Sequence, residues 1–390
     1  MRLARHFRHT CVQKYLTFRR SRLAVSVAAA LAMTTSFSLQ STTSAVAGKR
    51  VPEIGVNRPN LAELPEDQWK ATLESMSRAG VQLLRTNAAA PSAQVARLIR
   101  HANDRGIQVI LIVPLWLPAL YPPHVQPRQG NANYFAVRPI SRIDPVRFRA
   151  LWNGLRESMR AAGAHALAYQ IGNELNGAGF NGDYPIADDA RLIALDSCDL
   201  PRACKDILDG LALYVDLLRI VRESDLLDGA LLLPAGLAKT SEAWAARTKG
   251  FFSTPSATIR HLETLGTGRF VEAYAVHIYP NASLTNPKTG ARDVKRQIAD
   301  VVSECVPSGL TTKPCWVTEW GIASQHVSCE QDPSRMVLQE AGLRMLRDFM
   351  RRDILETAIY YDWDADGSLS VFRCGRLVDP AVVIPPPVPQ

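Results

Sequence analysis

Two glutamates, Glu174 and Glu319, each stand near the end of a short apolar run, where a charged side chain is costly unless it is paired or faces a cleft. The runs are Ala166–Glu174 (ALAYQIGNE) and Cys315–Gly321 (CWVTEWG). Two carboxyl groups that face each other can divide acid–base and nucleophilic work, because their surroundings can protonate one and keep the other ionised. We therefore take Glu174 and Glu319 as candidate catalytic residues.

Other polar and aromatic residues stand at comparable places, at or just after the ends of apolar runs. These candidates for substrate binding are Asn173, Arg85, His277, Tyr279, Trp363 and Trp116. Each also has a structural interpretation, as an ion-pair partner, a satisfied core histidine or simple packing. Their shared position at run ends is what makes them informative as a group.

Eight apolar runs recur from residue 52 onward and alternate with stretches of helical periodicity. Most runs are continuous, which is typical of parallel strands covered on both faces. We predict strands at Glu53–Asn57, Leu83–Asn87, Gln108–Pro114, Ala166–Glu174, Leu231–Gly236, Ala273–Pro280, Cys315–Gly321 and Ala358–Asp364. Helices are predicted between them, among others at Glu66–Arg78, Ala93–Asp104, Pro145–Ala161, Lys205–Arg222 and Arg335–Met350.

This alternation predicts an α/β protein, a single (β/α)8 TIM barrel over residues 48–378. An open doubly wound sheet is the alternative, but no G-x-G-x-x-G follows the first strand. The long loops 118–143 and 177–201 follow strands three and four, so they lie on the face where barrel active sites are built. Residues 379–390 are predicted to be a Pro-rich tail.

Residues 1–47 have the composition of a signal peptide, with seven basic residues, no acidic residue and an Ala45-Val46-Ala47 cleavage site. The apolar run Leu23–Met33 is too short for a membrane span of about 20 residues. An uncleaved anchor is the competing interpretation. Without this leader the net charge falls from +8 to +1, so we expect no nucleic-acid partner. We expect a secreted or periplasmic monomer with no stable membrane span after leader cleavage.

Six cysteines remain after the leader, and an even number in an oxidising compartment suggests disulfides. Their positions favour Cys198–Cys204, Cys305–Cys315 and Cys329–Cys374. The second pair flanks the turn that feeds strand seven, and the third lies in loops after strands seven and eight. No C-x-x-C spacing is present, which argues against a zinc or redox site.

The combination of motifs resembles clan A of the glycoside hydrolases, the cellulase-like and xylosidase-like barrel enzymes. Its elements are Asn173-Glu174 on strand four, Glu319 on strand seven, His277-x-Tyr279 on strand six and Trp363 on strand eight. The resemblance covers residues 52–378. Each motif is short, and their occurrence together on the matching strands is what makes the resemblance specific.

The resemblance implies a retaining hydrolase of β-linked sugars that needs no cofactor and no metal. Glu174 would be the acid/base, Glu319 the nucleophile, and Asn173 would hydrogen-bond the sugar 2-hydroxyl. Arg85 and Tyr279 would keep Glu319 ionised. His277 would line the cleft or steady a carboxylate, and Trp363 would offer its flat face to a sugar. Trp116 is a further sugar platform or, equally, a loop-packing residue, and the long loops suggest an endo-acting polysaccharide enzyme.

Two other functions fit parts of the sequence. A glycan-binding barrel would keep the cleft without turnover, which the presence of both glutamates argues against. A metal-dependent TIM-barrel hydrolase would use His277, Glu319 and Asp364. The stretch 362–367 matches the start of a calcium loop, but Arg373 stands where the bidentate Glu is needed, so we expect an ordinary Asp/Gly turn.

Overall fold

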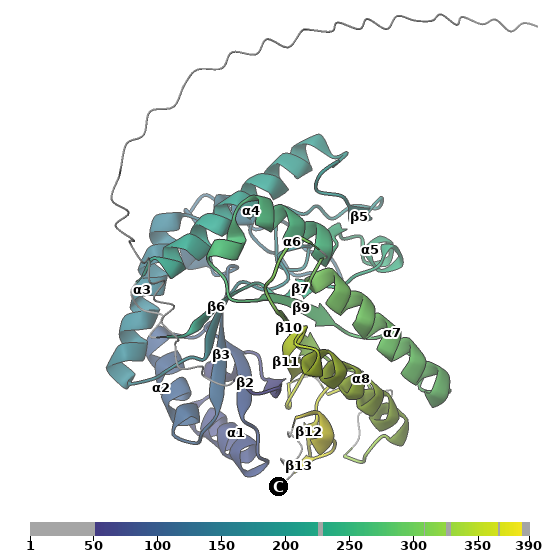
Figure 1. Cartoon of the computed structure of the whole chain (residues 1–390). Helices are drawn as coiled ribbons and strands as arrows, with labels where there is room; N and C mark the ends of the chain where they lie inside the picture. The colour runs from purple at the N-terminus through teal and green to yellow at the C-terminus, as the bar shows by residue number, and fades with distance from the viewer. Residues whose placement is uncertain (1–50, 225–228, 308, 325–328, 366, 384–390) are drawn as a thin grey trace, which may run out of the picture. The chain divides into compact units, whose positions relative to one another are not determined.

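Parallel strands form one sheet at the centre of the chain (Figure 1). The computed structural model describes residues 51–224, 229–307, 309–324, 329–365 and 367–383, so the predicted leader lies outside the described residues. The sheet has the order β6-β4-β3-β2-β1-β11-β10-β9-β7. Its strands are β1 (Ile54–Asn57), β2 (Leu83–Asn87), β3 (Gln108–Val113), β4 (Ala168–Ile171), β6 (Leu231–Pro234), β7 (Leu237–Ala238), β9 (Tyr274–Ile278), β10 (Cys315–Trp320) and β11 (Leu355–Tyr360).

The two ends of this sheet are neighbours in the chain, because only two residues separate β6 from β7. β7 pairs with β9 in a register that sets Ala238 beside His277. At the other end of β9, the Glu272 N–H donates to the Leu232 carbonyl of β6 at 3.0 Å. Strand five of the barrel is therefore interrupted between β6 and β7, and the sheet closes through it. The predicted (β/α)8 barrel is confirmed, and the open-sheet alternative is wrong.

Helices follow the strands and lie outside them (Figure 1). They are α1 (Glu66–Arg78), α2 (Ser92–Asn103), α3 (Pro145–Ala162), α4 (Pro201–Arg222), α5 (Glu242–Thr248), α6 (Pro255–Thr264), α7 (Pro287–Cys305) and α8 (Pro333–Arg351). Short 3-10 turns are η1 (Leu61–Glu63), η2 (Pro118–Leu120), η3 (Ile140–Arg142), η4 (Thr267–Arg269) and η5 (Pro380–Val382). Two small sheets, outside the barrel, pair β5 (Leu192–Ile193) with β8 (Phe252–Ser253) and β12 (Phe372–Arg373) with β13 (Arg376–Leu377).

Four of the helices begin with the same local device, a capping side chain followed by proline. Asp144, Thr254, Asn286 and Asp332 each accept a hydrogen bond from an N–H of the first turn, and a proline follows each of them. The cap satisfies a donor that has no partner inside the helix, and proline lacks the N–H that would need one there. These starts are set by local sequence alone.

The barrel interior is filled by side chains from the strands. Trp316 of β10 packs there with apolar side chains from strands around the barrel, among them Leu83, Ile110, Leu233 and Ile359. A larger apolar cluster lies between the strands and the helices. Because this packing fills the barrel centre, we expect a reaction site among the polar residues at the C-terminal ends of the strands.

All three predicted disulfides are present, with Cα–Cα distances of 5.9 Å for Cys198–Cys204, 5.8 Å for Cys305–Cys315 and 5.6 Å for Cys329–Cys374. The second joins the end of α7 to the first residue of β10. It therefore ties a helix to the strand that carries Glu319.

The chain beyond β11 is packed further than its composition predicts. Val382 and Val383 are buried, so ordered packing extends past the predicted barrel boundary at residue 378. Residues 384–390 of the predicted tail lie outside the described residues. Among the described helices, none combines the length and apolar character that crossing a membrane requires.

Asp183 joins the long loops that follow β3 and β4. Its carboxylate accepts hydrogen bonds from the Ser141 N–H at 3.0 Å and the Ser141 hydroxyl at 2.6 Å, and only 7% of the residue is exposed. Burial raises the pKa of Asp183 to about 6, because these bonds replace only part of the lost hydration. The folded protein therefore binds a proton at the Asp183 carboxyl group more tightly than the unfolded chain does.

We expect Asp183→Asn to alter how stability depends on pH. The raised pKa means that wild-type protein loses stability as pH rises from about 4 to 7, by about 2 kcal/mol for this group. Between pH 4 and 7, the free energy of unfolding of the variant should therefore rise by about that much relative to wild type, as measured by urea unfolding at both pH values. Asp189→Asn, on an exposed site in the same loop, is the control. A difference between Asp183→Asn and wild type that does not change with pH would contradict the expectation.

Candidate active site

Glu174 occupies a strained backbone position just past β4. Its φ is 41°, in the left-handed region that non-glycine residues seldom adopt, and its N–H donates to the Gly236 carbonyl at 2.8 Å. Strain of this kind costs of order 1–3 kcal/mol and persists only where the surroundings impose it, often at functional sites. The side chain is 22% exposed and faces the barrel mouth.

Glu319 of β10 is held by a buried arginine. The Arg85 guanidinium on β2 donates to Glu319 Oε1 at 2.6 Å, and the two side chains are 1% and 10% exposed. The rest of the guanidinium donates to uncharged oxygens of Asn57, Gln170 and Asn173, at 2.9, 2.7 and 2.9 Å. Arg85 therefore neutralises Glu319 and also orients Asn173, the neighbour of Glu174.

Two residues of the β9 segment contact the carboxylates. Tyr279 donates its hydroxyl hydrogen bond to Glu319 Oε2. His277 Nδ1 lies 2.8 Å from Glu174 Oε1 and 3.5 Å from Glu319 Oε2, and its Nε2 lies 3.0 Å from Thr318 Oγ1. Both ring nitrogens therefore have partners, Nδ1 on the side of the glutamates and Nε2 at the Thr318 hydroxyl. His277 thus bridges the two glutamates.

The charge state of Glu319 follows from these contacts. Burial by itself would raise its pKa, but the electrostatic interactions with His277 and Arg85 and the hydrogen bond from Tyr279 hold the pKa below the usual value. Although Tyr279 is 40% exposed, desolvation and the nearby Glu319 raise its pKa well above the usual value, which keeps its hydroxyl proton in place as a donor. Glu319 is therefore an ionised carboxylate at neutral pH.

The two carboxylates lie close together. Oxygen atoms of Glu174 and Glu319 and a ring nitrogen of His277 are all within 4.8 Å of one another. This is the one such group among the described residues. A cation here would lie near the Arg85 guanidinium. The alternative set His277, Glu319 and Asp364 is not brought together, because Asp364 pairs with Arg58 instead.

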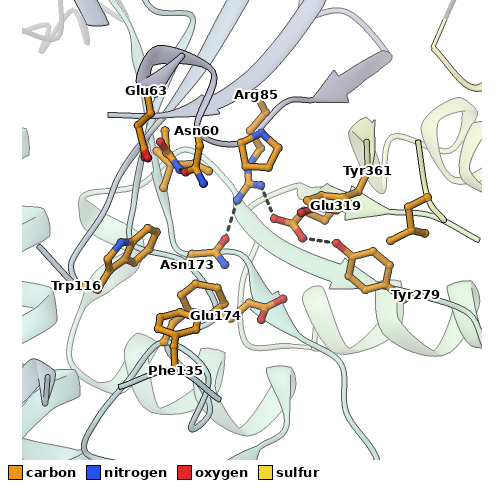
Figure 2. Close-up of a pocket in the computed structure, with 15 residues that line it drawn as sticks. Asn60, Glu63, Arg85, Trp116, Phe135, Asn173, Glu174, Tyr279, Glu319 and Tyr361 are labelled. Carbon is orange, nitrogen blue, oxygen red and sulfur yellow. Dashed lines mark hydrogen bonds and ion pairs between the residues drawn. The ribbon is translucent and has the colours of Figure 1, made fainter. Parts of the chain in front are cut away.

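A cleft of about 720 Å³ opens over this pair. Figure 2 shows the two carboxylates between Trp116 and Phe135 on one side and Tyr279 and Tyr361 on the other. The lining residues are Pro59, Asn60, Glu63, Arg85, Asn87, Ile112, Trp116, Phe135, Asn173, Glu174, Phe180, Tyr279, Glu319, Tyr361 and Leu369. Carboxyl groups flanked by aromatic faces suit a ligand with both apolar faces and hydroxyl groups.

The structure assembles seven of the eight site residues predicted from sequence at this cleft: Glu174, Glu319, Asn173, Arg85, Tyr279 and Trp116 line it, and His277 lies beneath the carboxylates. Trp363 is the exception. Its ring is fully buried and stacks on Phe372, with centroids 4.8 Å apart and planes at 10°, so the prediction that it offers a face to a sugar is wrong.

Tyr361 takes the place in the cleft that was predicted for Trp363. It follows the last residue of β11 and packs edge-on against Tyr279, with centroids 5.8 Å apart. Its position directly after a strand was the available signal. Phe135 and Phe180, from the long loops, were also missed, because loop sequence gives no periodicity from which to infer where a side chain points.

The stretch that matches the start of a calcium loop is a turn after β11 in the part that the structure describes. Asp362 is buried and accepts hydrogen bonds from the Ser370 hydroxyl at 2.8 Å and the Ala365 N–H at 3.0 Å. Asp366 lies outside the described residues. The first acidic group of the motif is thus used to hold the loop after β11.

Comparison with known proteins places the fold among glycoside hydrolase barrels. A GH5_18 protein from Streptomyces cattleya, solved in complex with GlcNAc, is similar over 85% of this chain and 78% of its own, with 16% identity and a TM-score of 0.51. A monomeric β-xylosidase from Caulobacter crescentus CB15 is similar over 80% of this chain and 60% of its own, with 14% identity and a TM-score of 0.51. At this identity the likeness shows the fold.

A family 39 glycoside hydrolase from Bacteroides cellulosilyticus WH2 is also similar, with 15% identity and a TM-score of 0.48. The match covers 85% of this chain but 61% of that protein. No family model matches the sequence, and no curated protein matches it. The predicted resemblance to clan A glycoside hydrolases is confirmed at the level of the fold.

Gly236 gives a test of how tightly the site is packed. A Cβ there would lie 2.1 Å from His277 Nε2 and 2.6 Å from Thr318 Oγ1, so a larger residue would displace the histidine from its present position. We expect Gly236→Ala to lower the free energy of unfolding by about 1–3 kcal/mol, the usual cost of overpacking. Urea unfolding measures it. Gly154→Ala on α3 is the control, because its Cβ meets nothing within 4 Å, and it should be neutral or slightly stabilising. Equal stability of both variants would contradict this packing.

Proposed function

We propose that this protein is a retaining glycoside hydrolase that cleaves β-linked oligo- or polysaccharide by double displacement. The observation that carries the proposal is the close approach of Glu174 and Glu319, whose oxygens come within 4.8 Å. Retaining enzymes hold their carboxyl groups about 5–5.5 Å apart, whereas inverting enzymes leave about 6.5–9.5 Å for a water. The fold comparisons support the same class of reaction.

In this proposal Glu319 attacks the anomeric carbon and Glu174 protonates the departing oxygen. Arg85 and Tyr279 keep Glu319 ionised before the attack, and Asn173 is oriented by Arg85 to meet the sugar 2-hydroxyl. Glu174 then removes a proton from the water that releases the sugar from Glu319. His277 contacts both carboxylates, so it can respond to the change in charge when Glu174 loses its proton and later regains it.

Two further parts of the proposal concern substrate and location. Aromatic side chains on both sides of the carboxyl pair support cleavage within a polysaccharide chain, because sugars on either side of the bond could stack on them. Release of oligosaccharides before monosaccharide would bear this out. Three disulfides support export to an oxidising compartment.

The two glutamates should differ in how they respond to the leaving group. Glu174→Ala should lose about 100- to 10,000-fold of the activity on natural glycosides but retain much of the first step on an activated aryl glycoside, which needs no acid. Its intermediate should accumulate, and azide should restore turnover with retained anomeric configuration, read by NMR. Glu319→Ala should be nearly inactive on both substrates, and any product formed with azide should be inverted. Equal losses on all substrates without azide rescue would refute the division of roles.

The pKa of Glu319 gives a test by pH. The hydrogen bond from Tyr279 lowers that pKa, so Tyr279→Phe should raise it and move the acid limb of the kcat/KM profile on an aryl glycoside to higher pH. Tyr361→Phe is the matched control, since the same atom is removed from a tyrosine in the same cleft. An acid limb that moves equally in both variants, or in neither, would show that Tyr279 does not set the ionisation of Glu319.

A further inference from the structure

One end of the cleft is built by the turn after β1. Asn60 has a φ of 56° in the left-handed region, and its Oδ1 accepts a hydrogen bond from Asn87 Nδ2 at 2.5 Å. Asn87 ends β2 and is 4% exposed, so the turn is fixed to the barrel by a buried side chain. Glu63, three residues along on η1, is thereby presented to the cleft.

The charges that line the cleft are mostly negative. They are three carboxylates, Glu63, Glu174 and Glu319, and one guanidinium, Arg85. Arg85 already donates to Glu319 and to three uncharged oxygens. Glu63 is exposed, and its carboxylate makes no ion pair with any described residue. A sugar carboxylate at this end would therefore meet a negative charge with no free cation among the lining residues that the structure describes.

The same end offers the contacts that an uncharged sugar needs. Trp116 is half-buried, and its ring packs at a tilt of 51° on Phe180, which holds it in place. Figure 2 shows Trp116 on the same side of the cleft as Asn60 and Glu63, away from Tyr279. A pyranose can set its apolar face on the indole while its hydroxyls donate to the Glu63 carboxylate and accept from the Asn60 amide.

We propose that Asn60, Glu63 and Trp116 form a second sugar subsite that takes an uncharged pyranose and rejects a uronic acid. The inference rests on the proposed glycosidase function and deepens it. The subsite lies on the glycone side, because the leaving group must sit beside its proton donor Glu174, which Figure 2 shows away from Asn60 and Glu63. Asn87 is a positioning residue, since it acts through Asn60.

The test compares aryl β-glycosides of one and two sugars. The single sugar is the one that wild type cleaves fastest among gluco, manno, galacto and xylo forms. The second sugar is a hexose, either neutral or oxidised at C6 to the uronic acid. Wild type should prefer the neutral disaccharide at least about 10-fold in kcat/KM. Glu63→Ala should lose about 10-fold on the neutral disaccharide and little on the monosaccharide, as for a hydrogen bond to a charged group. Glu63→Lys should reverse the preference toward the uronic acid.

Glu53→Ala is the matched control, because Glu53 is exposed just before β1, at the opposite end of that strand. Equal losses on one and two sugars in Glu63→Ala, or no discrimination by wild type, would overturn the subsite while leaving the glycosidase proposal intact. Cleavage of none of the aryl glycosides would count against the glycosidase proposal instead. The subsite is then judged by calorimetric binding of the free disaccharides. The subsite is supported if wild type binds the neutral disaccharide and Glu63→Ala abolishes that binding. It is overturned if wild type binds both disaccharides equally.

Discussion

The ion pair between Arg85 and Glu319 is the interaction on which the rest of the site depends. A guanidinium and a carboxylate that are this deeply buried are stable only as a pair, and removal of one partner of such a pair typically costs about 3–5 kcal/mol. Arg85 meets its requirement for acceptors with oxygens from three further barrel residues, so the pair also fixes the geometry between strands. Any reaction at Glu319 must proceed within that frame.

The interruption of strand five is the second constraint. β6 and β7 leave Gly236 between them, and its missing side chain makes room for His277 while its carbonyl accepts from the Glu174 N–H. A continuous strand with an ordinary side chain there could not place the histidine between the two glutamates. The closure of the barrel and the assembly of the carboxyl pair are thus parts of the same local arrangement.

Specificity is a property of the loops rather than of this frame. The cleft walls come from the turn after β1, the long loops after β3 and β4, and the segments after β9 and β11. Asp183 ties the β3 and β4 loops together by its bonds to Ser141. The barrel therefore supplies a rigid pair of carboxylates, and the loops decide which ligands can reach them.

The sequence by itself determined the eight-stranded barrel, the pairing of the cysteines and six of the fifteen residues that line the cleft, both glutamates among them. Local signals suffice for these features, because continuous apolar runs, helix caps and polar strand ends depend on near neighbours in the chain. Only the tertiary structure decided that Trp363 turns into the core while Tyr361 faces the cleft, and that Glu63, Phe135 and Phe180 join the site. Those outcomes depend on side-chain direction after a strand ends, where neither helical nor strand periodicity holds and packing against distant segments sets the chain's path.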